Sequence, residues 1–244
     1  MHPLICKIGP LTVYSYGVML TVAVLVCSLL LTREAKRLGL SADIVLDLIF
    51  WIVVGGILGA RLFYIALNLE FYLEDPWEII MLQHGGLAFQ GGLLGGILSG
   101  LYFIRRHALP LLPTLDLVAP YIALGHAIGR IGCFLNGCGY GKEVPWGIFF
   151  PSHQANMHPT QLYESAGLLV IFLILKRCER SIKYPGQIFV YYLMLSSVLR
   201  FTNEFFRADH IELWMGLSIF QIVSVGILIM AFYASAHIKS RTRK

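Results

Sequence analysis

The residues of this chain that stand out chemically are charged side chains within long apolar stretches. Six of them lie inside or at the end of such a stretch: Arg61, Arg130, Glu164, Arg200, Glu204 and Arg207. Burying a charge at the centre of a bilayer costs on the order of 2.5–3.5 kcal/mol on insertion scales, so a charge kept there has a partner or a function. Guanidinium groups match phosphate geometry and stay charged at every relevant pH. Arginines that converge in one leaflet therefore predict an anion site, whose occupant at that depth is a phospholipid head group.

A purely structural interpretation of these arginines stays open. Arg200 and Glu204 stand four residues apart, which is the spacing of a helical ion pair. Glu164 is a possible partner for Arg61. This pairing would leave Arg130 without a carboxylate, so the hypothesis of an anion site depends most on Arg130.

The segment 125–141 is denser in polar residues and glycine than an ordinary membrane span. His126 and Arg130 are four residues apart and share one face of a helix. The glycines of 137–141 then break the helix and open a loop. Irregular backbone at membrane depth is tolerated only where protein or a water-filled cavity receives it, so this segment predicts a site.

The five cysteines are scattered along the chain: Cys6, Cys27, Cys133, Cys138 and Cys178. They form neither a disulfide framework nor a paired CxxC zinc site. Cys133 and Cys138 stand five residues apart, which is poor spacing for a shared metal, and a disulfide between them is the alternative. No metal site is expected.

These side chains must be positioned by membrane spans. The chain is 57% hydrophobic and 14% charged, whereas a soluble domain carries about 25% charged residues. Several apolar stretches approach the roughly 18–20 residues that cross a bilayer. We predict an all-α, polytopic membrane protein with about seven spans, at roughly 14–31, 44–66, 86–104, 116–135, 160–176, 186–203 and 214–236.

The distribution of basic residues predicts the orientation of these spans. Most of the 19 Lys and Arg residues fall in connections that seven spans place on one side, around 33–37, 105–106, 176–183 and 239–244. The positive-inside rule makes that side cytoplasmic, so the N-terminus is expected outside and the C-terminus in the cytoplasm. The first span is expected to be uncleaved, because basic residues follow it rather than precede it. We expect one integral-membrane domain over 1–244, with an interfacial arm on the outer leaflet at about 68–83.

Several segments together resemble the bacterial prolipoprotein diacylglyceryl transferase family. The matching segments are HGGLAFQGG (84–92), GRIGCFLNGCGYG (129–141), HPTQLYES (158–165) and RFTNEFFR (200–207), with support from 14–17, 59–62, 217–218 and Gln221. They run in order across nearly the whole chain. Seven spans with the N-terminus outside are also what this resemblance implies.

The resemblance implies a reaction and its partners. Members of this family transfer the diacylglyceryl group of phosphatidylglycerol to the lipobox cysteine thiol of preprolipoproteins. A thioether forms and glycerol phosphate leaves, without a metal or an organic cofactor. The implied location is the bacterial inner membrane, with the active site towards the outer leaflet, and the implied partners are phosphatidylglycerol and signal peptides, with no nucleic acid.

The resemblance also implies roles for particular residues. We expect a catalytic set of Arg130, Arg200, Glu204, Gln90 and His126. We expect substrate contacts from a wider set: Tyr16, Arg61, His84, Cys133, Asn136, Cys138, Gly141, His158, Gln161, Glu164 and Arg207.

The chain departs from the family pattern at three of these positions. Gln90 stands where the best-known members carry a histidine that is a candidate base, and Cys133 and Cys138 stand where they carry asparagine and glutamate. Glutamine cannot act as a base, which makes His84, His126 and His158 the three main candidate replacements, with Tyr16 and Glu204 as weaker ones. Two other functions stay open. One is a paralogue that uses a phospholipid donor with another acceptor, and the other is a non-catalytic lipid-binding protein.

Overall fold

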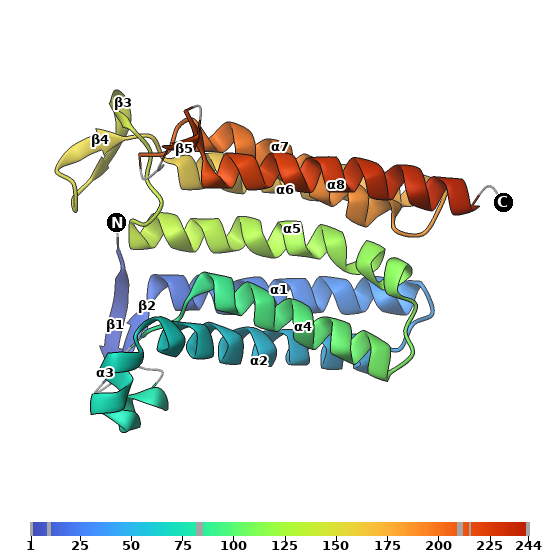
Figure 1. The fold of residues 1–244 in the computed structure, drawn as a ribbon, viewed down its shortest axis with the longest axis horizontal. Coiled ribbons are helices and arrows are strands. Elements are labelled where there is room, and N and C mark those ends of the chain that lie inside the picture. The colour runs from blue at the N-terminus through green and yellow to red at the C-terminus, as the bar shows by residue number, and fades with distance from the viewer. Residues whose placement is uncertain (1, 9–10, 82–84, 209–211, 215, 243–244) are drawn as a thin grey trace. The chain divides into compact units, whose positions relative to one another are not determined.

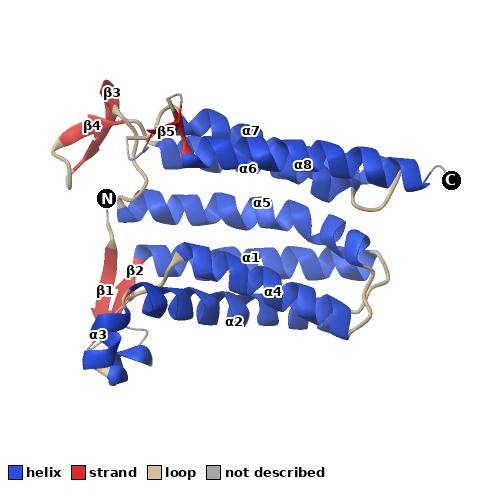
Figure 2. Cartoon of the chain, in the orientation of Figure 1, coloured by secondary structure: helices blue, strands red, loops and turns tan. Residues whose placement is uncertain are grey.

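The computed structural model describes residues 2–8, 11–81, 85–208, 212–214 and 216–242, and it is mostly helical (Figures 1 and 2). Its internal contacts divide the chain into two compact units. The first unit comprises Met1–Leu30 with Leu115–Lys244, and the second comprises Leu31–Thr114. The arginines 130, 200 and 207 belong to the first unit, whereas Arg61 and Gln90 belong to the second.

Among the residues that the structure describes, seven long helices overlap the seven predicted spans. They are α1 (Ser15–Arg37), α2 (Ala42–Leu67), α4 (Phe89–Arg106), α5 (Leu111–Asn136), α6 (Thr160–Cys178), α7 (Gln187–Glu204) and α8 (Ile219–Thr242). Of the helices within the described ranges, four are long and apolar enough to cross a membrane, namely α1, α2, α5 and α8. That all seven cross the membrane stays a prediction.

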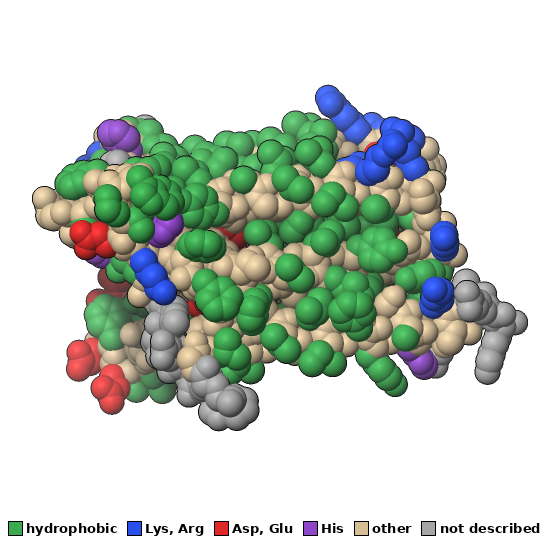
Figure 3. Space-filling view, turned by 90° about the horizontal axis from the view of Figure 1, so that it is seen from above, with side chains coloured by type: hydrophobic (Ala, Val, Ile, Leu, Met, Phe, Trp, Pro, Cys, Tyr) green, Lys and Arg blue, Asp and Glu red, His purple; other side chains and the backbone are tan. Residues whose placement is uncertain are grey.

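The outer surface of these helices is apolar. Hydrophobic side chains cover most of the face shown in Figure 3. On α8, Ile229, Phe232 and Tyr233 are all more than half exposed. Side chains of this kind are suited to contact with lipid hydrocarbon rather than water.

Short elements that the all-α prediction did not include join the long helices. They are three antiparallel hairpins, β1 (Leu4–Ile8) with β2 (Leu11–Tyr14), β3 (Glu143–Phe150) with β4 (Ala155–Met157), and β5 (Glu212–Trp214) with β6 (Leu217–Ser218). A further short helix is η3 (Glu179–Ser181). The hairpin β1–β2 precedes α1, and the other two lie in connections between long helices. Aromatic and β-branched residues favour extended backbone in these segments, which are too short to cross a bilayer.

The predicted interfacial arm is helical where it is described. It contains α3 (Leu69–Glu74) and η1 (Pro76–Ile79), and its residues 82 and 83 lie outside the described residues. Phe71 and Trp77 are exposed along this arm. Exposed aromatic side chains between acidic residues fit a position at a membrane interface, which stays a prediction.

Glycine brings α2 and α4 into close contact in the second unit. A Cβ atom on Gly59 would overlap the carbonyl oxygen of Gly91 and come within 2.9 Å of the Gly95 Cα atom. A Cβ atom on Gly95 would overlap the carbonyl oxygen of Gly55. Small residues at helical spacing let two backbones approach in a membrane, and here they do so on one face of each helix.

We expect Gly95→Ala to destabilise this helix pair by about 1–3 kcal/mol, because the added methyl group meets backbone that cannot move aside. Gly96→Ala is the matched control. Its Cβ atom would lie 3.4 Å from the nearest atom, the carbonyl oxygen of Ile52, which is close to ordinary contact. Thermal unfolding of both variants in detergent, followed by circular dichroism, checks the difference. Equal unfolding temperatures for the two variants would contradict the close packing of α2 and α4.

Small residues also let α6 and α7 pack against α5 in the first unit. Ala119, Ala123 and Ala127 of α5 form a buried cluster with Leu168 of α6 and Ile188 of α7. The backbone carbonyl of Ala127 accepts a hydrogen bond from the Ser165 hydroxyl at 2.8 Å. These contacts fix the three helices that carry Arg130, Glu164 and Arg200.

The buried carboxylate of Asp116 holds the first turn of α7 from a neighbouring helix. Its Oδ2 atom accepts a hydrogen bond from the Gly186 amide at 2.6 Å, and its Oδ1 atom accepts one from the Phe189 amide at 2.9 Å. The first amides of a helix have no partner within the helix, so a carboxylate placed there stabilises it. Asp116 thereby locks α7 against α5.

Candidate functional site

The carboxylate of Glu164 is the centre of a polar cluster between α5, α6 and α7. It is 2% exposed, and its Oε1 atom accepts a hydrogen bond from Arg130 Nη2 at 2.8 Å. Its Oε2 atom accepts a hydrogen bond from Asn203 Nδ2 at 3.1 Å and lies 3.7 Å from Arg200 Nη1. His126 Nε2 is 3.7 Å from Oε1. One buried carboxylate therefore gathers two arginines and a histidine that the sequence separates by up to 74 positions.

A second buried carboxylate extends the cluster along α7. Glu204 is 1% exposed, and its Oε2 atom lies 3.0 Å from Arg200 Nη2 and 3.8 Å from Arg207 Nε. Its Oε1 atom accepts a hydrogen bond from the Ser218 hydroxyl at 2.9 Å. The guanidinium group of Arg200 also lies over the ring of Phe220, 4.7 Å from its centroid. The pairing of Arg200 with Glu204, which the spacing indicated, is present.

The partner of Glu164 differs from the one that the structural interpretation of the sequence assigned. Glu164 pairs with Arg130, so Arg130 is not left without a carboxylate. The guanidinium group of Arg61 instead donates hydrogen bonds to backbone carbonyls, including those of Ile79 and Gly86, both at 3.1 Å. Arg61 is 5% exposed and lies 5.3 Å from the centroid of the Tyr72 ring. Arg61 thus orders the backbone that links the arm to α4.

The cluster holds more positive than negative groups. Three arginines, Arg130, Arg200 and Arg207, surround two carboxylates. Arg130 Nε and Arg200 Nη1 are buried and have no hydrogen-bond partner among the residues that the structure describes. A buried donor without a partner costs about 1–3 kcal/mol. An anion bound beside Glu164 would supply the acceptors that these two donors lack among the described residues.

The loop after α5 is fastened to the start of α6. The carbonyl of Cys138 accepts a hydrogen bond from Gln161 Nε2 at 2.8 Å, and the carbonyl of Gly139 accepts one from the Thr160 hydroxyl at 2.7 Å. Gln161 and Thr160 are each 1% exposed. The start of α6, with Pro159 at the N-cap position, thus also anchors the glycine loop.

Gly141 lies where three segments meet. It forms a β-bridge with Arg207, and its amide donates to the carbonyl of His158 at 3.0 Å. A Cβ atom there would come within 2.6 Å of the Phe206 carbonyl oxygen and 2.7 Å of the Thr160 methyl group. Glycine at this position lets the loop approach the end of α7, and the Arg207 guanidinium group reaches the loop at Gly139.

His158 belongs to an aromatic cluster rather than to the arginine cluster. Its ring lies 4.7 Å from that of Trp146, 5.4 Å from Phe206 and 5.9 Å from Tyr163. Its Nδ1 atom is 3.2 Å from the Tyr163 hydroxyl. Of the three candidate replacement bases, His126 is therefore the one that the structure brings to the arginines, and His84 lies outside the described residues.

The remaining predicted residues occupy different places. Tyr16 of α1 packs against Gly132 of α5 and is 40% exposed, and Asn136 ends α5 in an exposed position. Gln90 is the second residue of α4 and is exposed, within the second unit. Its role stays a prediction.

The thiol of Cys138 lies just beyond the end of α5, beside that of Cys133. A hydrogen bond from the Cys133 side chain lowers the pKa of Cys138 to about 6, against the opposing effect of burial. The Asn136 side chain, the Cys138 amide and the positive charge of Arg130 lower this pKa further. A thiolate is therefore favoured at neutral pH, close to the arginine cluster.

We expect alkylation of Cys138 by iodoacetamide to rise with pH and to be half-maximal near pH 6, because the thiolate is the nucleophile and its pKa lies at about 6. Replacing Cys133 with alanine removes the largest cause of the lowered pKa of Cys138. The midpoint of Cys138 alkylation should therefore move to higher pH. Peptide mapping by mass spectrometry after timed alkylation measures both midpoints. An unchanged midpoint in Cys133→Ala would contradict the assigned cause.

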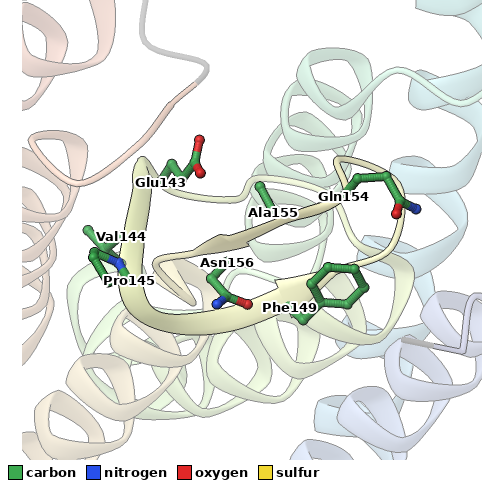
Figure 4. A pocket seen from close by; sticks show the side chains of 7 residues that line it. All are labelled: Glu143, Val144, Pro145, Phe149, Gln154, Ala155 and Asn156. Atoms are coloured by element: carbon green, nitrogen blue, oxygen red, sulfur yellow. The ribbon is translucent and has the colours of Figure 1, made fainter.

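A separate hollow lies on the hairpin β3–β4 (Figure 4). It has a volume of about 330 Å³ and is lined by Glu143, Val144, Pro145, Phe149, Gln154, Ala155 and Asn156. None of these residues was predicted to act in a site. The hollow lies on the surface of the hairpin, and the arginine cluster contributes no residue to it.

Three residues that hold the site together lie in the segments that resemble the family, but the sequence analysis gave them no role. Asn203 bonds to Glu164, Ser218 bonds to Glu204, and Thr160 anchors the loop at Gly139. Asn203 carried a usable signal, because it is an amide within an apolar span between Arg200 and Glu204. Ser218 and Thr160 are ordinary residues for a helix start, so their spacing carried no signal.

Comparison with known proteins gives one consistent result. The model of a family described as prolipoprotein diacylglyceryl transferase matches residues 3–236. The chain is 37% identical to a protein named phosphatidylglycerol--prolipoprotein diacylglyceryl transferase from Bacillus mycoides (strain KBAB4). It is 36% identical to proteins of the same name from Bacillus cereus (strain G9842) and Bacillus thuringiensis subsp. konkukian (strain 97-27). Each match covers 92% of this chain and 87% of the relative.

Proposed function

The chain belongs to the prolipoprotein diacylglyceryl transferase family, and on that premise we propose that it transfers the diacylglyceryl group of phosphatidylglycerol to the lipobox cysteine of a preprolipoprotein. The observation in this chain that supports the proposal is the buried cluster in which Glu164 and Glu204 pair with three arginines. The buried donors on Arg130 and Arg200 that have no partner in the described part of the chain suit the phosphate of a lipid head group.

The proposed reaction is a substitution at an sp³ carbon. The thiolate sulfur of the acceptor forms a bond to the glyceryl carbon, and the bond from that carbon to the phosphate oxygen breaks. The phosphodiester, which carries one negative charge, leaves as glycerol phosphate, on which negative charge grows. Guanidinium groups fixed before the reaction stabilise this growing charge more than the ground state, and that difference accelerates the step.

The acceptor thiol must lose a proton, and we propose His126 as the group that takes it. Its side chain is 40% exposed, so it is accessible, and its Nε2 atom lies 3.7 Å from Glu164 Oε1. Gln90 has no basic atom and fits a hydrogen-bonding role with the substrates. Glutamine at position 126 keeps hydrogen-bonding atoms but has no basic nitrogen. We therefore expect His126→Gln to lower the rate of diacylglyceryl transfer without a loss of phosphatidylglycerol binding.

We also propose that the whole chain is one membrane domain of seven spans in the inner membrane, with the N-terminus and the site on the outer side. The basic connections on the opposite side support this orientation. Single cysteines at 105 and at 142, in a chain freed of its own cysteines, test it. A membrane-impermeant maleimide should label position 142 in intact cells and position 105 only after permeabilisation, and the reverse pattern would contradict the orientation.

Purified protein in detergent, mixed with phosphatidylglycerol and a lipobox peptide, tests the reaction. We expect a diacylglyceryl adduct on the peptide cysteine by mass spectrometry, with release of glycerol phosphate, and loss of both in Arg130→Ala and Arg200→Ala. Consumption of phosphatidylglycerol without an adduct would point to a different acceptor. A folded protein that neither consumes the lipid nor modifies the peptide would instead be a non-catalytic lipid-binding member of the family.

A further inference from the structure

The end of α5 brings two cysteines together through its backbone. The amide of Cys138 donates to the carbonyl of Cys133 at 3.1 Å, and the amide of Gly137 donates to the carbonyl of Phe134 at 3.2 Å. Gly137 has a φ angle of +82°, in the left-handed region that favours glycine. This pair of hydrogen bonds with a left-handed residue between them is the Schellman motif, in which Cys133 and Cys138 hold the positions called C3 and C″.

The Schellman motif places the side chains at C3 and C″ in contact, usually as an apolar pair. In this chain both are thiols, and Cys138 Sγ lies 3.6 Å from the carbonyl oxygen of Cys133. Both thiols are free, with Cys133 half-buried and Cys138 exposed. A disulfide requires Cα atoms within about 7 Å and Cβ atoms that face each other. The hydrogen bond from the Cys138 amide to the Cys133 carbonyl holds the two backbones close, and the motif pairs the side chains at these positions.

The surroundings make one of these thiols the more reactive. Cys138 is accessible, and its backbone is fastened by the hydrogen bond from Gln161 to its carbonyl. Arg130 stands one turn before Cys133 and favours negative charge on the Cys138 sulfur. The other three cysteines lie on separate elements, with Cys6 on β1, Cys27 on α1 and Cys178 at the end of α6.

We propose that Cys133 and Cys138 form a reversible thiol–disulfide pair, a modification site beside the arginine cluster that reacts with organic disulfides. The Cys138 thiolate attacks one sulfur of the organic disulfide, which releases one thiolate and leaves a mixed disulfide on Cys138. The Cys133 sulfur, after losing its proton to solvent, then attacks the Cys138 sulfur and expels the second thiol. The two cysteines lose two electrons and two protons in total, and the organic disulfide is reduced to two thiols.

The whole detergent-solubilised protein treated with glutathione disulfide tests this site. We expect the peptides that contain Cys133 and Cys138 to lose two hydrogen masses and to become inert to maleimide, and dithiothreitol to restore both. Cys6, which is exposed and has no neighbouring cysteine on its strand pair, should instead carry one glutathionyl group. This difference within one molecule needs no variant and does not depend on folding of a mutant.

The variant Cys133→Ala is the matched control for the second step. It should stop at a stable glutathionyl group on Cys138, because the thiol that expels it is missing. Recovery of wild-type protein with separate glutathionyl groups on Cys133 and Cys138 would overturn the proposal. So would wild-type protein in which neither cysteine reacts while Cys6 is fully modified.

Discussion

We expect Arg130→Lys to lower the turnover of diacylglyceryl transfer by roughly 10²–10³-fold, the usual effect of losing one donor to a developing negative charge. Lysine keeps the charge but not the fork of donors. In the wild type, Arg130 Nη2 is held by Glu164 at 2.8 Å while Nε has no partner among the described residues, so one guanidinium group both anchors itself and presents a donor. A single ammonium group cannot do both in that geometry.

Steady-state kinetics with phosphatidylglycerol and a lipobox peptide measure this effect. The fall should appear in kcat, with KM for the lipid changed far less, because the lost interaction strengthens as charge grows on the leaving phosphate. Arg105→Lys, at the exposed end of α4, is the matched control and should retain full activity. Full activity in Arg130→Lys would show that the reaction does not need the several donors of the guanidinium group.

The long helices could be predicted from the sequence because each depends on a local property. A run of about 18 or more apolar residues predicts a helix whatever lies around it. The ion pair of Arg200 with Glu204 was predictable for the same reason, since residues four apart on one helix are neighbours. The importance of Arg130 was predictable locally too, because it is a charge within an apolar stretch, and the family resemblance supported it.

Contacts between helices could not be predicted in this way. The sequence does not determine how α5 is rotated about its axis relative to α6, so it could not identify the partner of Glu164. In α4, the segment 91–96 contains two Gly–Gly pairs. Gly92, Gly96 and Gly100 stand at helical spacing as Gly91 and Gly95 do, but Gly91 and Gly95 make the closest approach to α2. A shift of one residue is invisible to composition but rotates the contact face by about 100°.

The buried position of Glu164 leads to the second large effect, on stability. We expect Glu164→Gln to destabilise the lipid-free protein by roughly 3–5 kcal/mol, because removing one partner of a buried ion pair leaves the other charge uncompensated. Glu164 is 2% exposed and faces Arg130 at 2.8 Å and Arg200 at 3.7 Å, so two guanidinium groups lose their counter-charge together.

Phosphatidylglycerol should reverse part of this loss. A phosphodiester between the two arginines supplies the missing negative charge, so the lipid binds the folded variant more tightly than the wild type and stabilises it more by mass action. Unfolding temperatures at increasing phosphatidylglycerol concentrations, in a neutral detergent, measure this stabilisation. The unfolding temperature should rise more steeply with lipid concentration for Glu164→Gln than for wild type. Asp116→Asn is the matched control, since it removes a buried carboxylate that faces the amides of Gly186 and Phe189 rather than an arginine. If the lipid raised all three unfolding temperatures equally, its phosphate would not be bound between Arg130 and Arg200.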